Sequence, residues 1–473
     1  MRLVPLSGLD AGFLALETPR APMLVGGLSI LDPTTAPKGL DVDRLRALLR
    51  QRLSRSVALR RQLASLPLDL ARPYWTELDP ADVDLAAHVE RTELPAPGGW
   101  RELSALMAWE VSQPLDRRRP LWKMTFVDGL RLPGHPAGTL GLIGTAHHAA
   151  IDGVSGAEIL GALFDDESAA TRDEPAVVVA PPIEPPGVLE LLSRAGRDLA
   201  AAPLGAPRVV GRSLLGLAAS AWSRVTSDET PPLPFAAPKS VLNRPLAGRL
   251  GWAPAAFPLS RIKAIKTAAE ASVNDVVLAV CAGALRGWLV EHGELPAAPL
   301  VAMVPVSVRG SDERAQAGNL VSAMLVSLAT DEPDPRARLR RIRDAARGSK
   351  VAHQAIGART LLASADLLPF ALAGLGAQLY SRLQLAARHR PLFNVVITNV
   401  PGPTRPLRIG GAALLSHFGA TPLFDGLGLI LTVMSYAGAV TIGVSADQAV
   451  MSEVSPFADR LLAALEELER ATA

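Results

Sequence analysis

Two adjacent histidines followed by an aspartate occur in the segment GTAHHAAIDG, residues 144–153. Imidazole titrates near neutral pH, so a histidine held in one orientation can accept a proton from a substrate hydroxyl. His148 and Asp152 have the spacing H-x-x-x-D, in which the aspartate holds the ring or fixes the loop. His147 on an extended segment would point the other way. We therefore predict His148 as a general base, Asp152 as the residue that positions it, and His147 as a packing neighbour within the same catalytic motif.

Metal binding and a purely structural role are the alternatives for these histidines. Two histidines and an aspartate are ordinary zinc ligands. However, adjacent histidines on a strand diverge, and no H-E-x-x-H motif accompanies them. Cys281 is the only cysteine, which excludes a multi-thiolate zinc site. We therefore expect no metal, while a structural histidine–aspartate pair stays open at this point.

The flanking sequence predicts that the motif lies on a strand-to-helix connection. The upstream run TLGLIGTA has the profile of a buried strand. Downstream, SGAE at residues 155–158 matches the capping box that begins a helix. Ligand sites in α/β folds gather beyond the carboxyl ends of strands, and Gly153 permits a tight exit from such a loop. We therefore include Gly153 among the substrate-binding residues.

Composition excludes several classes of protein. Of the 473 residues, 49% are hydrophobic and 20% are charged, a globular composition that permits greasy ligands. The formal net charge is +2, so no bulk field favours nucleic acid as a partner. The opening MRLVPLSGLDAGFLALETP lacks the pattern of a secretion signal, and the single cysteine fits a reducing compartment. We therefore expect a cytoplasmic protein.

The chain divides into two patterned halves. Residues 166–240 are acidic and Pro-rich at first and weakly helical later, which is typical of a crossover between residues 1–165 and 241–473. Both halves mix strand-like runs with helices, so we predict an α/β fold with mixed sheets. The longest uncharged stretch, Gly426–Ala446, has β-branched runs on both sides of Gly438, which favours a buried hairpin over a membrane span.

Two segments combine a leucine or isoleucine stripe with many arginines. We predict amphipathic, basic helices over Val42–Leu63 and Pro335–Val351. A solvated surface is the simpler interpretation of each charged face. A site for phosphate or for acidic lipid is the alternative.

Three further elements carry polar or aromatic side chains. The segment SVND, residues 272–275, predicts a helix start in which the serine caps and the aspartate bonds back, with Gly293 ending the helix. Trp122 is expected to be a core aromatic near the site, with direct substrate contact as the alternative. TNVPGP places Asn399 just before a rigid turn.

HHAAIDG resembles the H-H-x-x-x-D-G motif of the bacterial wax ester synthase/diacylglycerol acyltransferase family. That family belongs to the H-x-x-x-D acyltransferases, which include chloramphenicol acetyltransferase and condensation domains. Gly8 departs from the family pattern, because many relatives have proline there, but it affects a turn and not the chemistry. The other similar segments follow in the family's order along nearly the whole chain: PLSGLDAGFLALETPRAPMLVGGLSIL, RRRPLWKMTFVDGL with Pro-Leu-Trp at 120–122, SVNDVVLAVCAGALRGWL with Asn-Asp at 274–275, MVPVSVR, GNLVSAMLVSL and NVVITNVPGP.

The resemblance implies a fold and a mechanism. Each half would form one chloramphenicol acetyltransferase-like unit, with a channel at their interface and His148 at its middle. Fatty acyl-CoA is the implied donor, diacylglycerol or a fatty alcohol the implied acceptor, and no other cofactor is needed. Asn274 would donate a hydrogen bond to the substrate or the oxyanion. Asn399 would line the acyl channel, and Trp122 would lie near it.

We therefore predict an O-acyltransferase that makes triacylglycerol, wax esters or both. Its acceptors are insoluble, so we expect peripheral contact with a membrane or lipid-droplet surface. Two alternatives stay open: a condensation-like acyltransferase that uses a carrier-protein thioester, and a non-catalytic lipid-binding module in which His148 is structural.

Overall fold

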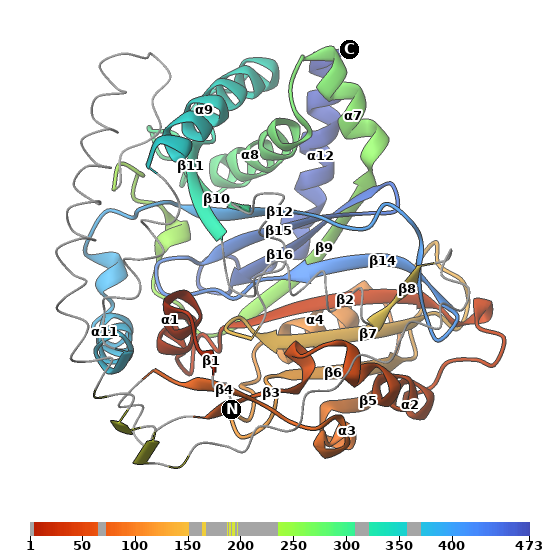
Figure 1. Cartoon of the computed structure of the whole chain (residues 1–473). Helices are drawn as coiled ribbons and strands as arrows, with labels where there is room; N and C mark the ends of the chain where they lie inside the picture. The colour runs from red at the N-terminus through yellow and green to blue at the C-terminus, as the bar shows by residue number, and fades with distance from the viewer. Residues whose placement is uncertain are drawn as a thin grey trace.

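Two large sheets of mixed strand direction form the centre of the molecule, and a small sheet of β1 (Val4–Pro5), β4 (Tyr74–Glu77) and β3 (Arg61–Ala64) lies beside them (Figure 1). Three predicted features, Asp152, Gly153 and the capping box at 155–158, lie outside the described residues. The computed structural model describes residues 4–64, 72–150, 163–166, 235–307, 321–356 and 370–473, with a few positions between 187 and 196.

The first sheet has the strand order β5-β6-β7-β2-β14-β13-β8. Strands β5 and β6 are parallel, and the other neighbours are antiparallel. Leucines of α2 (Val42–Arg52) pack on one face and those of α4 (Trp100–Glu110) on the other. The strand bounds are β5 Val89–Glu93, β6 Trp122–Asp128, β7 Leu140–His147, β2 Leu24–Asp32, β14 Ala412–Ala420, β13 Leu407–Ile409 and β8 Asp165–Asp166.

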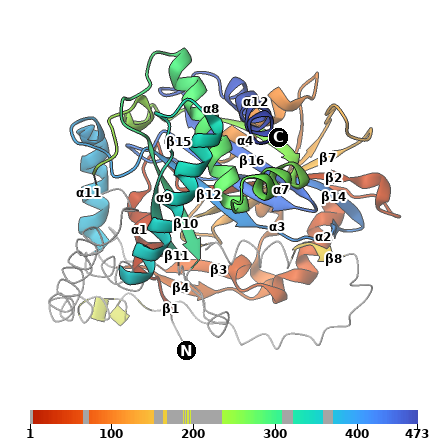
Figure 2. The same cartoon turned by 90° about the horizontal axis from the view of Figure 1, so that it is seen from above.

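The second sheet has the order β11-β10-β12-β15-β16-β9, with β12 parallel to β10 and β15. Helices α7, α8, α9 and α12 cover its outer face (Figure 2). Their apolar side chains form one continuous core with this face. The predicted α/β class with mixed sheets is thus confirmed. The bounds are β11 Val321–Ser327, β10 Val301–Ser307, β12 Val395–Pro401, β15 Leu429–Tyr436, β16 Ala439–Asp447, β9 Leu250–Pro258, α7 Leu259–Ala268, α8 Val273–Glu291, α9 Pro335–Ile356 and α12 Ser455–Thr472.

Strand β14 belongs to the second half of the sequence but completes the first sheet. It pairs with β2 along nearly its whole length. Strand β14 also contacts the second sheet. The hydroxyl of Thr441, in β16 of that sheet, donates to the carbonyl of His417, in β14, at 2.7 Å. A Cβ on Gly443 would lie 1.8 Å from the Gly419 carbonyl oxygen, so this approach requires glycine. The sequence pattern did not predict this exchange between the halves.

Two local predictions of the second half are confirmed. Strands β15 and β16 form an antiparallel hairpin with Gly438 in its turn at a φ of 85°. Helix α8 begins with a capping box, in which the Ser272 hydroxyl accepts from the Asp275 amide and the Asp275 carboxylate accepts from the Ser272 amide. Among the described helices, α8 has the length and apolar composition of a membrane span, but 72% of its apolar window is buried in the fold.

The predicted helix over Val42–Leu63 is too long. Helix α2 ends at Arg52, and the chain continues through 3₁₀ turns into β3. Pairing of β3 with β4 overrides the helical spacing of the leucines there. The predicted helix from Pro335 is present as α9, which extends to Ile356.

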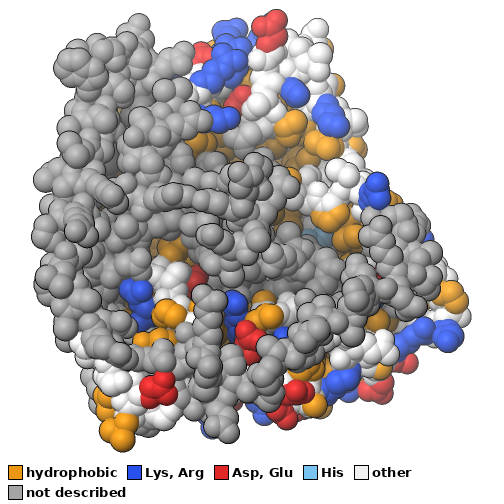
Figure 3. All heavy atoms as spheres, in the orientation of Figure 1, with side chains coloured by type: hydrophobic (Ala, Val, Ile, Leu, Met, Phe, Trp, Pro, Cys, Tyr) orange, Lys and Arg blue, Asp and Glu red, His pale blue; other side chains and the backbone are white. Residues whose placement is uncertain are grey.

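Several arginines of these two segments bind the protein itself. Arg50 donates to the Val83 carbonyl at 2.9 Å, and the buried Arg52 contacts Asp165. On α9, buried Arg338 donates to the Glu332 carbonyl at 3.0 Å. On the described part of the face in Figure 3, Lys and Arg alternate with Asp and Glu rather than forming one basic field. These contacts favour a structural role for much of the basic charge.

Candidate active site

The backbone fixes both histidines where β7 ends. The His147 amide donates to the Leu121 carbonyl at 3.0 Å, and the His148 amide donates to the Met23 carbonyl at 2.9 Å. A turn follows at once, because the Ala150 amide donates to the His147 carbonyl at 2.8 Å. Contacts from two separate segments, together with this turn, therefore determine where the two side chains point.

His147 is buried, and the backbone holds its Nδ1. Its Nδ1 accepts a hydrogen bond from the Ala149 amide at 3.0 Å. The proton of the neutral ring therefore lies on Nε2, which faces Glu17 Oε2 at 3.6 Å. With only 2% of the residue exposed, the ring has an internal rather than a substrate-facing position.

Glu17 and Arg117 extend this contact into a partly buried ionic network. Arg117 Nε lies 3.2 Å from Glu17 Oε2, and its Nη2 contacts the same oxygen. Burial alone would raise the pKa of Glu17, but the interactions with His147 and Arg117 outweigh it and lower the pKa below its usual range. Glu17 is therefore a carboxylate at neutral pH. The sequence prediction missed both residues, since no local pattern joins positions one hundred residues apart.

His148 points to a different environment from His147, as the alternation along a strand predicts. Its ring stacks on Phe13, with the centroids 3.8 Å apart and the planes 22° from parallel. Phe13 belongs to α1 (Gly8–Leu16), which Ser7 caps by accepting from the Asp10 amide at 3.0 Å. His148 is partly exposed, whereas His147 is buried. The stack fixes the plane of the ring and leaves part of the residue accessible.

The second sheet approaches His148 through an apolar cluster. Met23, whose carbonyl holds the His148 amide, packs with Val396 of β12 and Ile430 of β15. Phe13 packs against the same cluster. His148 therefore lies near the contact between the two sheets, as the predicted channel position requires.

Asn274 and Asn399 meet each other, on the far side of β12. Asn399 Nδ2 donates to Asn274 Oδ1 at 3.1 Å. Side chains alternate along a strand, and Ile397, on the same face as Asn399, packs in the core under α8. Val396 on the opposite face packs toward His148. The structure thus joins the two asparagines but places them on the helix side of the sheet, and their substrate roles stay predictions.

The face of β12 toward His148 presents Thr398 instead. Its register partner Thr432 lies on the same face and bonds Thr421 across the contact between the sheets at 2.8 Å. The Thr398 hydroxyl is buried and has no hydrogen-bond partner within the described part of the chain. No sequence signal pointed to Thr398.

On the opposite face of β12, Asn399 lines a cavity of about 250 Å³ beside Lys263 and Val277.

Comparison with known proteins identifies the family. Residues 6–277 match the family model described as wax ester synthase/diacylglycerol acyltransferase catalytic domain, and residues 317–469 match its C-terminal domain. The chain belongs to this family. It is therefore an acyltransferase, and the predicted resemblance is confirmed.

Relatives in the wax ester synthase/diacylglycerol acyltransferase family match over nearly full length. A putative diacylglycerol O-acyltransferase of Mycobacterium tuberculosis is 37% identical over 482 residues, which cover 98% of this chain and 99% of that protein. The wax ester synthase/diacylglycerol acyltransferase from Marinobacter aquaeolei VT8 superposes with a TM-score of 0.67 at 28% identity, covering 99% of this chain and all of the other. The first condensation domain of the calcium-dependent antibiotic synthetase, at 17% identity and a TM-score of 0.57, shares the fold.

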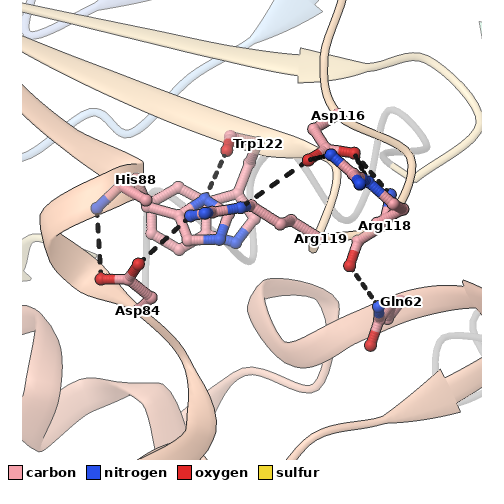
Figure 4. A network of polar contacts seen from close by, with 8 residues as sticks. Gln62, Asp84, His88, Asp116, Arg118, Arg119 and Trp122 are labelled. Carbon is pink, nitrogen blue, oxygen red and sulfur yellow. Dashed lines mark hydrogen bonds and ion pairs between the residues drawn. The ribbon is translucent and has the colours of Figure 1, made fainter.

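The family's Pro-Leu-Trp element places Trp122 in the core of the first sheet (Figure 4). Its Nε1 donates to the Leu59 carbonyl at 2.8 Å, and its ring stacks on His88 at 4.3 Å. Arg119 and Asp84 form an ion pair at 3.2 Å beside this stack. These contacts favour the core interpretation, while contact with substrate stays a prediction.

Within the described ranges, no group of three or more His, Cys, Asp or Glu side chains is arranged to hold a metal ion. Cys281 is buried in α8, where burial raises the pKa of its thiol to about 12. The family motifs thus contribute polar groups at two places: the turn after β7 and the beginning of α8.

Proposed function

We propose that this acyltransferase moves a long-chain acyl group from fatty acyl-CoA to the hydroxyl of diacylglycerol, of a long-chain alcohol, or of both. The observation that carries this proposal is the position of His148. Its backbone is fixed by Met23, its ring is oriented by Phe13, and the residue is partly exposed near the contact of the two sheets. This is the arrangement that a directed base needs.

In the proposed reaction, His148 removes the hydroxyl proton of the acceptor as its oxygen attacks the thioester carbonyl. The tetrahedral intermediate then collapses, the carbon–sulfur bond breaks, and the CoA sulfur leaves with the proton that His148 carries. The ester and free CoA are the products. Because a thioester is already activated and both substrates bind together, no acyl-enzyme, metal or additional cofactor is needed. Asp152 would position the loop and ring, and Gly153 would shape its exit.

We also propose that the enzyme works in the cytoplasm at the surface of a membrane or lipid inclusion. Diacylglycerol and fatty alcohols are poorly soluble, so the enzyme must take them from such a surface. The structure supports contact with a surface rather than insertion, since α8, the apolar helix of sufficient length among those described, is mostly buried.

The test is product formation by purified wild type and His148→Ala. Each is given palmitoyl-CoA with dioleoylglycerol, with hexadecanol, or with neither, and ester is measured by mass spectrometry together with free CoA. We expect ester from wild type only, and the acceptor that yields more ester is the preferred one. His147→Ala serves as the neighbouring control, because it loses a buried structural contact rather than the base.

Equal rates of CoA release in wild type and His148→Ala would overturn the role of His148. If the folded wild type forms no ester with either acceptor, the donor or acceptor is wrong. In that case turnover of a carrier-protein thioester would favour the condensation-like alternative.

A further inference from the structure

Helix α11 (Phe370–Arg382) has an exposed apolar stripe. Leu375, Leu379 and Leu383 are 56%, 53% and 52% exposed. The last of them directly follows the helix, and its amide bonds the Leu379 carbonyl at 2.9 Å, which continues the helical turn. A spacing of four residues places the three leucines within an arc of roughly 80°, along about 12 Å of the helix.

The opposite side of α11 faces the protein. It packs against α1, and the two helices lie side by side in both views (Figures 1 and 2). The Tyr380 hydroxyl hydrogen bonds to His389 Nε2 at 2.7 Å. The leucine stripe is therefore the outer surface of a helix that already has its internal contacts.

Basic residues flank the stripe. Arg382, Arg388 and Arg390 are exposed, and none has an ion pair with a described acidic residue. The sequence contains no aspartate or glutamate between Asp366 and Asp425. This charge differs from that of α9, where Arg341 pairs with Asp331 at 2.9 Å. Leucines beside arginines that have no acidic partner among the described residues match the chemistry of an anionic lipid surface, whose acyl chains would contact the leucines and whose phosphates would contact the arginines.

The stripe is also close to the proposed base. The same α1 that supports α11 carries Phe13, on which the His148 ring stacks. We propose that this α11 face, defined as Leu375, Leu379 and Leu383 with Arg382, Arg388 and Arg390, docks the enzyme on anionic phospholipid. The proposal rests on the proposed function, because it names the surface from which the lipid acceptor reaches His148.

The experiment is vesicle flotation of the full chain with phosphatidylcholine vesicles, with and without phosphatidylglycerol. Wild type is compared with an apolar variant, Leu375→Ser/Leu379→Ser/Leu383→Ser, and a charge variant, Arg382→Gln/Arg388→Gln/Arg390→Gln. The matched controls are Leu462→Ser, a leucine 41% exposed on α12, and Arg336→Gln/Arg340→Gln/Arg347→Gln on α9.

We expect both α11 variants to lose about tenfold or more in partition to anionic vesicles, and both controls to bind like wild type. Added salt should weaken the binding of wild type more than that of the charge variant. The proposal is overturned if the α11 variants float as wild type does, or if the α9 control is the one that loses binding. It is equally overturned if light scattering shows a wild-type dimer that the apolar variant converts to monomer, because the stripe then binds a second copy.

Activity separates this proposal from the proposed function. With a short-chain acceptor in solution, the α11 variants should match wild type, since none of the six residues touches His148. With acceptor in anionic vesicles, they should be slower in proportion to their lost binding. A wild type that binds vesicles but forms no ester would contradict the proposed function and leave the docking surface standing.

Discussion

The turn after β7 and the beginning of α8 both carry motif residues, but the fold uses them differently. After β7, one histidine is held in a buried polar network, while His148 is partly exposed beside Phe13. At the beginning of α8, the serine and aspartate form a capping box, and Asn274 accepts from Asn399. Polar groups at α8 thus satisfy one another, whereas after β7 one histidine is buried and the other stays partly accessible. Of the two motifs, the one after β7 therefore leaves a titratable side chain open to a ligand.

Replacing the partly exposed histidine, His148, should give the largest effect. We expect His148→Gln to lower kcat by about 10²- to 10⁴-fold, which is the usual contribution of a general base. Its unfolding midpoint should stay near that of wild type, because His148 is not part of the ionic network of Glu17, Arg117 and His147. Steady-state kinetics and thermal unfolding of the same preparations check this. A variant that keeps kcat within tenfold would remove the distinction between the two histidines.

Glu17→Gln tests the network that holds the other histidine. Neutralising this partly buried carboxylate should lower the free energy of unfolding by about 1 kcal/mol at neutral pH, since Arg117 and His147 lose a charged partner and solvent screens part of the interaction. The pKa of Glu17 is lowered in the folded state, so its contribution is complete above the ordinary value of 4.5 and disappears as the pH falls through the lowered value. Urea unfolding from neutral to acidic pH should show the gap between wild type and variant closing. A gap that is constant with pH would assign the loss to packing instead.

The pair at α8 should act mainly on stability. Asn274→Ala and Asn399→Ala each remove one partner of the amide contact, so a double-mutant cycle should give a coupling of about 0.5–1.5 kcal/mol. A fall in kcat of about 10²-fold for Asn274→Ala at unchanged stability would instead support its predicted role as an oxyanion donor.

Thr398→Val replaces a side chain by one of nearly the same shape. It should not lower the free energy of unfolding, because the buried Thr398 hydroxyl lacks a described partner.

The smallest effect is expected at Cys281 in the middle of α8. Its burial and a thiol pKa of about 12 predict no measurable alkylation of the native enzyme by iodoacetamide at neutral pH. Activity should therefore be unchanged after treatment, and mass spectrometry should show the label only after denaturation. Rapid labelling of the native chain would show that α8 opens readily.

Local sequence patterns predicted several elements of the second half and strand β7, which ends at His147. The β7 run, the capping box at Ser272 and the hairpin at Gly438 each depend on a few consecutive residues, and all three are confirmed. The contacts that complete the site depend on distant residues. Glu17 meets Arg117 only because α1 and the segment before β6 converge, and α2 ends early because β3 finds a partner in β4.

Strand β14 makes the two halves one folding unit. Strand β2 has β7 on one side and β14 on the other, so the first sheet lacks one of its interior strands until β14 has been synthesised. Until then the nine residues of β2 have an unpaired edge, which is the kind of edge that pairs with other chains. We therefore expect a gene fragment that stops in the crossover to give an aggregation-prone polypeptide, and co-expression of the second half to restore its solubility.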